Sequence, residues 1–163
     1  MNTHTLSVMV ENEPGVLSRV SGHFSGRGFN IRSLNVAPTL EPGVSLMTIV
    51  AEGDDQIIEQ IVKQLRKLVP TIRVKDLTEV KSVEREMVLL KVNAEDSKRA
   101  EILRIVDIFR CKVVDVSVDE LIIEVTGDKG KIKALTNLLT RFGIKEVART
   151  GAVALKRSMQ IDD

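Results

Sequence analysis

The chain has 163 residues, 43% of them hydrophobic, which is enough for one medium domain or two small ones with apolar cores. Its 24 Lys and Arg residues nearly balance its 23 Asp and Glu residues, and the segment up to Thr78 holds 8 of each sign. Neither half has the basic excess that phosphate-backbone binding needs, and without Trp or Tyr few rings could stack on bases. We expect no nucleic-acid partner.

The sequence also indicates the cellular compartment in which the protein is expected. No apolar run reaches the roughly 20 residues that cross a bilayer, and the start, Met1 to His4, lacks the basic and apolar regions of a secretory signal. Cys111 is the only cysteine, which excludes an internal disulfide and a cysteine-cluster metal site. We therefore expect a protein of the reducing cytoplasm that does not contact membranes.

Residues 1–78 predict the order strand, helix, strand, strand, helix, strand. Leu6, Val8 and Val10 alternate with their neighbours as in a strand, and later apolar residues recur at helical spacing. Asp54 or Asp55 is expected to cap the second helix, and the glycines at 26 and 28 to close the first. The expected elements are strands over 6–10, 30–36, 46–51 and 72–77, and helices over 16–24 and 57–68.

A polar, charge-mixed segment, 79–85, is expected to be a linker, and the same order of elements returns after it. The second set comprises strands over 87–92, 112–118, 121–125 and 144–155, and helices over 97–109 and 129–142. With right-handed crossovers, each half forms one sheet covered by two helices. The predicted fold is α+β, with two tandem ferredoxin-like βαββαβ sandwiches over residues 1–78 and 86–163.

The segment from Glu11 to Leu17 places a turn and a helix start directly after the first strand. Amides at a helix start lack intrahelical partners, so they can hold a carboxylate without a basic side chain. Gly15 leaves the backbone accessible, the Asn12 amide both donates and accepts, and Val16 and Leu17 could contact an apolar group. Alternatively, Asn12 is only a helix cap and Gly15 only a turn residue, and both interpretations fit the local sequence.

Asn30 also has two interpretations. It could cap a chain reversal, or it could reach a ligand across a subunit boundary. Small sandwiches leave sheet edges that invite pairing with another copy, and side-by-side sheets would bring the Asn30 strand of one chain near the Asn12 turn of its neighbour. A ligand site between the subunits of a homodimer would result.

No residue set in the sequence predicts catalysis or metal binding. His4 and His23 are not spaced with carboxylates or with Cys111 as a metal site requires, and His23 is expected at the surface or in a subunit contact. Cys111 follows a helix end and is expected to be a small, half-buried residue. The paired acids are interpreted as a helix cap (54–55), a hairpin turn (119–120) and a chain end (162–163).

With its Glu11 to Leu17 turn and Asn30, the first half resembles an ACT domain, the ferredoxin-like module that binds amino acids at subunit interfaces. The whole chain closely resembles the regulatory small subunit of acetolactate synthase. The residues that carry this resemblance are 6–8, 11–20, 24–31, 33–34, 36–38, 47–49, 60, 63–65, 67–69, 83–86, 108–110, 114–116 and 146–151. Pro14 stands where the family often has another small residue, and it suits the first turn of a helix.

The resemblance implies a chain that is not an enzyme and has no cofactor of its own. It implies binding to the large catalytic subunit, which would carry thiamine diphosphate, magnesium and FAD, and activation of that subunit with feedback inhibition by valine in branched-chain amino acid synthesis. A methylene is worth only about 1–3 kcal/mol in such a pocket, so leucine and isoleucine are expected as weaker effectors. The implied effector residues are Asn12, Gly15, Val16 and Leu17 of one chain and Asn30 and Ile31 of its mate, with Ser18 and Ala37 nearby.

Two other functions fit part of these observations. A stand-alone ACT-domain sensor would control transcription or a different enzyme, and it would not bind the large subunit. A small enzyme with its site in the carboxyl-terminal half would turn over a substrate without any partner.

Overall fold

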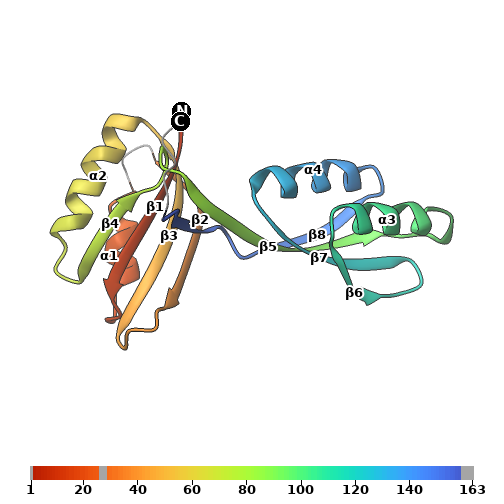
Figure 1. Cartoon of the computed structure of the whole chain (residues 1–163), viewed down its shortest axis with the longest axis horizontal. Helices are drawn as coiled ribbons and strands as arrows, with labels where there is room; N and C mark the ends of the chain where they lie inside the picture. The colour runs from red at the N-terminus through yellow and green to blue at the C-terminus, as the bar shows by residue number, and fades with distance from the viewer. Residues whose placement is uncertain (1, 26–28, 159–163) are drawn as a thin grey trace. The chain divides into compact units, whose positions relative to one another are not determined.

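The structure, a computed structural model, describes residues 2–25 and 29–158, which form two compact units. One unit comprises Met1–Val83 together with the chain from Ala152 onward, and the other comprises Glu84–Gly151. Each unit has its own sheet, its own two helices and its own apolar core (Figure 1).

The first unit is a four-stranded antiparallel sheet in the order β2-β3-β1-β4. Its elements are β1 (Asn2–Glu11), α1 (Val16–Gly22), β2 (Asn30–Pro38), β3 (Val44–Gly53), α2 (Asp55–Lys67) and β4 (Thr71–Asp76). Both helices contribute to a single core with one face of the sheet, which places α1 and α2 on that same face. The core residues of β1 are the alternating Leu6, Val8 and Val10, as expected.

Local sequence explains the ends of α2. The Asp54 side chain accepts a hydrogen bond of 2.8 Å from the Gln56 amide, so Asp54 is the cap. The helix ends at Lys67, three residues before Pro70, which cannot continue it. Its buried residues, Ile58, Ile61, Val62 and Leu65, form one stripe toward the sheet.

The second unit repeats this plan with the strand order β6-β7-β5-β8. Its elements are β5 (Ser82–Asn93), α3 (Asp96–Ile108), β6 (Lys112–Val116), β7 (Glu120–Gly127), α4 (Lys129–Thr140) and β8 (Ile144–Arg149). Helices α3 and α4 share a core with the sheet. Two tandem ferredoxin-like sandwiches are therefore confirmed, and the chain adds one further strand, β9 (Val153–Lys156).

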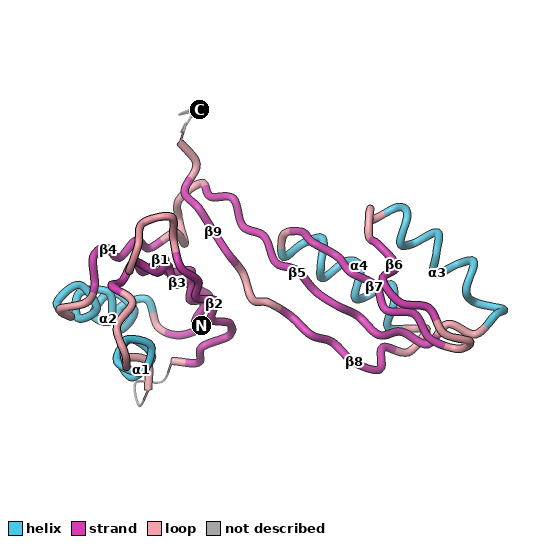
Figure 2. Tube along the Cα trace, turned by 90° about the horizontal axis from the view of Figure 1, so that it is seen from below, coloured by secondary structure: helices cyan, strands magenta, loops and turns pink. Residues whose placement is uncertain are grey.

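The last strand and the linker differ from the expectation. The predicted strand over 144–155 is two strands, β8 and β9, separated near Gly151, which has a φ of 81°. β9 pairs with β5 (Figure 2), and the Arg157 amide donates to the Lys81 carbonyl at 2.9 Å. Because this returning segment supplies backbone partners, β5 begins at Ser82, inside the segment expected to be a linker, despite its charged composition. The glycines expected to close the first helix lie outside the described residues.

Candidate functional site

The turn before α1 exposes its backbone. Gly15 is the N-cap residue and has a φ of 82°, in the left-handed region that favours glycine. No atom lies within 4 Å of the position that a Cβ would take at Gly15, so the backbone is open to an approaching molecule. The cap has no side-chain hydrogen bond, and the interpretation of Asn12 as the helix cap is therefore wrong.

The amides of this turn are used unequally. The Val16 amide donates to the Glu13 carbonyl at 3.3 Å, and the Arg19 amide donates to the Gly15 carbonyl at 3.1 Å. Within the described part of the chain, the amides of Gly15, Leu17 and Ser18 have no acceptor. The donors open to a ligand are therefore these three, and the Val16 amide is already engaged.

The side chains of the turn also differ in how far they are exposed to a ligand. Val16 is 7% exposed and packs into the core, whereas Leu17 is 41% exposed. Asn12 is exposed, and its backbone amide donates to the Gly43 carbonyl at 2.7 Å. A ligand above this turn would therefore contact the side chains of Leu17 and Asn12, but only the backbone of Val16.

Asn30 and Ile31 lie at the opposite end of the sheet. Asn30 is exposed on β2 and pairs with Glu52 of β3, whereas Glu11, just before the turn, pairs with Val44. Eight steps of β3 separate the two pairs, roughly 25 Å at ~3.3 Å per residue. Ile31 is half-buried against the core. One chain therefore does not bring the six expected residues together.

The Asn12 turn and the Asn30 end of β2 have charged residues of both signs nearby. Glu11 and Glu13 flank Asn12 and are exposed, so the turn pairs free amides with nearby carboxylates. Beside Asn30, the Arg32 guanidinium forms an ion pair with Glu52 at 2.6 Å. This mixture suits a zwitterion better than a simple anion, because the carboxylates can face an ammonium group while the amides face a carboxylate.

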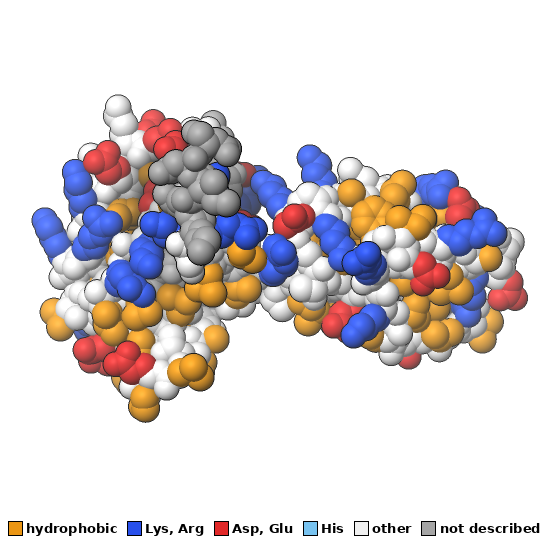
Figure 3. All heavy atoms as spheres, viewed as in Figure 1, with side chains coloured by type: hydrophobic (Ala, Val, Ile, Leu, Met, Phe, Trp, Pro, Cys, Tyr) orange, Lys and Arg blue, Asp and Glu red, His pale blue; other side chains and the backbone are white. Residues whose placement is uncertain are grey.

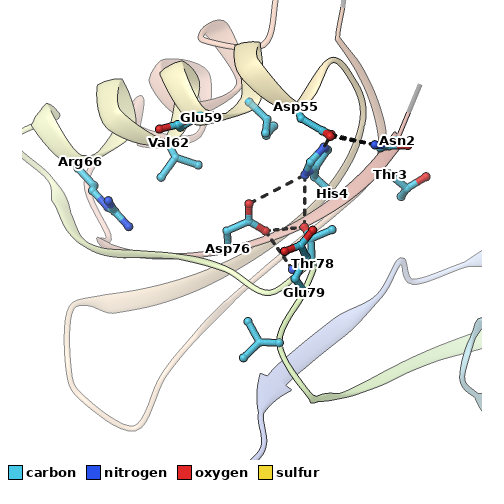
Figure 4. A pocket seen from close by; sticks show the side chains of 12 residues that line it. Asn2, Thr3, His4, Asp55, Glu59, Val62, Arg66, Asp76, Thr78 and Glu79 are labelled. Carbon is cyan, nitrogen blue, oxygen red and sulfur yellow. Dashed lines mark hydrogen bonds and ion pairs between the residues drawn. The ribbon is translucent and has the colours of Figure 1, made fainter.

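A pocket of about 780 Å³ lies at the end of the first unit away from the Asn12 turn, between α2 and the segment after β4 (Figure 4). The buried His4 ring lies among polar groups there. Its Nε2 is 2.7 Å from Oδ1 of Asp55, and its Nδ1 is 3.4 Å from Oγ1 of Thr78 and 4.0 Å from Oδ2 of Asp76. The Asn2 side chain also donates to Asp55, at 3.0 Å.

These contacts give His4 carboxylate neighbours, Asp55 and Asp76, that the sequence analysis did not identify. The partners of His4 are about 50 and 70 residues away in the chain, so sequence spacing could not reveal them. Among the described residues, no group of three or more His, Cys, Asp or Glu side chains could hold a metal ion. The His4 network joins β1, α2 and the segment after β4 within one unit.

His23 and Cys111 are packing residues. His23 is half-buried at the end of α1, and its Nδ1 atom is 3.2 Å from Oε1 of Gln64, so the ring joins this end to α2. Cys111 is half-buried against the second core, as expected. Burial raises the pKa of its thiol above the ordinary value, and nearby Lys131 lowers it in part. A raised pKa leaves little thiolate for nucleophilic chemistry.

No helix in the part of the chain that the structure describes is long and apolar enough to span a membrane.

Comparisons with known proteins identify the family. A family profile described as "AHAS small subunit-like ACT domain" matches residues 6–73, and one described as "Small subunit of acetolactate synthase" matches residues 85–158. The "Probable acetolactate synthase small subunit" of Archaeoglobus fulgidus is 55% identical, over 94% of this chain and 96% of its own length. The "Acetolactate synthase small subunit 2, chloroplastic" of Arabidopsis thaliana is 53% identical, over 94% of this chain and 32% of its own length.

A solved structure agrees along almost the entire chain. The crystal structure of the acetolactate synthase small subunit from Thermotoga maritima is 44% identical, covers 98% of this chain and 100% of its own, and has a TM-score of 0.86. Family profiles that match most of the chain and relatives at this identity lead to one conclusion: the chain belongs to the acetolactate synthase small-subunit family, with an ACT domain in its first half.

Proposed function

We propose that this chain is the regulatory subunit of acetolactate synthase, which binds the large catalytic subunit, raises its activity and makes it sensitive to valine. The single observation that carries this proposal is the match of both units to one small-subunit family. A small subunit implies a large partner, which would hold the thiamine diphosphate, magnesium and FAD. We place the pair in the cytoplasm, because relatives of this chain occur in archaea and bacteria.

The proposed valine site consists of the Asn12 turn of one chain and the Asn30 end of β2 from its twin. Three open amides near Gly15 would hold the carboxylate, and the Glu11 and Glu13 carboxylates are available to the ammonium. Leu17 of the first chain would contact the branched side chain. The separation of these two places within one chain supports a site shared by two chains.

β2 is the strand on which two chains would meet. It lies at an edge of the first sheet, so its outer backbone groups are open to a neighbouring strand. Two sheets joined there about a two-fold axis run antiparallel, and each Asn30 end then approaches the far end of its neighbour. The proposed homodimer therefore supplies the geometry that a single chain lacks.

Regulation would follow from linkage. If valine binds one arrangement of the regulatory dimer more tightly, it shifts the joint equilibrium with the catalytic subunit toward a less active form. The catalytic subunit must then change the valine affinity of the dimer by the same factor. The size of the effect is limited by the difference in valine affinity between the two arrangements.

Reconstitution tests the proposal. The full chain is mixed with the large subunit from the same source, and acetolactate formation is measured with and without valine. We expect the chain to raise the rate and valine to lower it again, with leucine and isoleucine weaker. If the chain does not bind the large subunit but does bind valine, it is a stand-alone amino-acid sensor. If it binds neither, the proposal is wrong.

A further inference from the structure

An apolar edge of the second sheet has no cover in the described chain. β6 lies at the end of the strand order and pairs with β7 on one side only. Val114 and Val116 on β6 are 50% and 61% exposed, and Val118, just beyond the strand, is 86% exposed. In Figure 3 apolar side chains gather over the edge where Figure 1 places β6.

This edge is held firmly by the chain around it. The Arg99 guanidinium of α3 donates to the Ser117 and Val118 carbonyls at 2.7 and 2.9 Å and to the Ala94 carbonyl. The Ser117 amide closes the turn by donating to the Glu120 carbonyl at 2.9 Å. The exposed valines are therefore presented in one fixed arrangement, which lowers the entropic cost of binding.

The opposite edge of the same sheet, β8, differs from β6 in its charged residues. β8 carries Lys145, Glu146 and Arg149, and each forms an ion pair, Glu146 and Arg149 with residues of the adjacent β5 and Lys145 with Glu120 of β7. Charged side chains on an edge strand discourage pairing with another chain. Among the five residues of β6, the charged ones are Lys112 and Asp115, and the other three are valines.

These two charges are arranged to complement a second copy of the same strand. The pairing of β6 with β7 shifts between Val113 and Asp115, so that Lys112 lies opposite Glu124 and Asp115 opposite Ile122. Because Glu124 and Ile122 are two residues apart, they lie on one face of β7. Lys112 and Asp115 therefore share a face, although three residues apart they would lie on opposite faces of a regular strand.

We propose that the β6 edge binds the β6 edge of a second copy of this chain, antiparallel, about a two-fold axis between Val113 and Val114. In this register each Lys112 faces the Asp115 of the other copy, and the exposed valines lie along the seam. The contact is separate from the β2 edge, and it depends on neither valine nor the catalytic subunit.

The register also places Cys111 of one copy opposite Val116 of the other. Facing residues in antiparallel strands have Cα atoms about 4.5–5.5 Å apart, within the range of a disulfide. The full chain with Val116→Cys, treated with a mild thiol oxidant, should therefore form a covalent dimer on a non-reducing gel. Three controls should stay uncross-linked. In Val118→Cys the new cysteine faces residue 109 of the other copy, which is not a cysteine. The unaltered chain and the double variant Val116→Cys with Cys111→Ser each lack one of the two facing cysteines.

Charge reversal provides the second readout, in the Val116→Cys background. Lys112→Glu places two like-charged pairs across the seam and should lower the cross-linked fraction roughly fivefold. The double variant Lys112→Glu with Asp115→Lys restores opposite charges and should recover the cross-linked fraction of the Val116→Cys chain. Circular dichroism confirms that each variant is folded. Absence of the Val116→Cys dimer, equal cross-linking of Val118→Cys, or failure of the double reversal to recover the yield would overturn the proposal.

Discussion

The two units share a topology but differ at one equivalent place, the start of the first helix. In the first unit, Gly15 begins α1 in a left-handed conformation and leaves three amides open. In the second unit, Glu95 begins α3, and the amides of Glu95, Asp96 and Ser97 likewise have no acceptor within the described chain, but the β6–β7 hairpin lies against this helix start. The Arg99 side chain and the Ala94 amide donate to carbonyls of the β6–β7 hairpin, and in this sense the hairpin closes the start of α3.

The comparison shows that a shared fold does not give the two helix starts the same surroundings. The starts of α1 and α3 each follow a central strand, and each helix packs on the same face of its sheet as its companion helix. The open start of α1 has Pro and Gly, and the closed start of α3 has acidic residues at 95 and 96, which would repel a carboxylate. Local residues therefore make the two helix starts chemically different, although the two units share a fold.

The largest expected effects come from the two cores. Leu65 on α2 and Leu135 on α4 are both fully buried, each in the core of its own unit. Either Leu→Ala change should lower the free energy of unfolding by about 2–5 kcal/mol. Leu65→Ala should also weaken valine binding, while Leu135→Ala should leave it unchanged. Denaturant unfolding and calorimetry measure the two effects. Equal loss of binding in both variants would contradict the assignment of the site to the first unit.

Side chains at the open start of α1 should control affinity without changing stability. Asn12→Ala and Leu17→Asp should each weaken valine binding by about 1–3 kcal/mol, because they remove a polar partner and an apolar contact. Asn137→Ala and Leu138→Asp are matched controls on α4, where Asn137 is exposed and Leu138 is 44% exposed. Isothermal titration of the four variants should separate the two pairs, and similar affinities in all four would move the site elsewhere.

Backbone conformation gives a smaller, more selective effect. Gly15→Ala and Gly43→Ala both place a Cβ at a φ near 80° with no atom within 4 Å. Each should cost about 1–2 kcal/mol of stability through this conformation. Only Gly15→Ala should also disturb the open amides and weaken valine binding. A normal affinity in Gly15→Ala, with the expected loss of stability, would show that these amides do not hold the carboxylate.

The smallest effect concerns the closed start of α3. The ion pair with Glu120, at the hairpin that closes this helix start, raises the pKa of Lys145. A raised lysine pKa stabilises the fold at neutral pH, and this contribution is lost as pH rises through the raised pKa. Lys145→Gln should therefore slightly destabilise the chain at pH 7, with the difference from the unaltered chain shrinking at strongly alkaline pH. A difference that grows with pH would contradict this sign.

Much of the fold follows from local sequence. The alternation of Leu6, Val8 and Val10, the stripe on α2 and the Asp54 cap each depend on neighbouring residues and physical rules of short range. The pairing of β9 with β5 could not be predicted, because its residues are more than sixty positions apart and its partner segment is polar.

The candidate site was predictable only in part. Gly15 leaves its backbone accessible, as expected, and Leu17 is exposed enough to contact an apolar group. The burial of Val16 and the use of its amide by Glu13 depend on how the short α1 is seated on the sheet, which local sequence does not determine. The contacts of His4 are likewise made by tertiary packing.

Mixing two defective variants tests the shared site most directly. At a valine concentration near the Kd of the unaltered chain, Asn12→Ala and Asn30→Ala chains should each bind little valine, since every site in either homodimer lacks one residue. After subunit exchange at equal amounts, half of the dimers contain both variants, and each of these has one intact site, so about a quarter of all sites should bind again. If the mixture binds no more valine than its two components, the site does not join Asn12 of one chain to Asn30 of another.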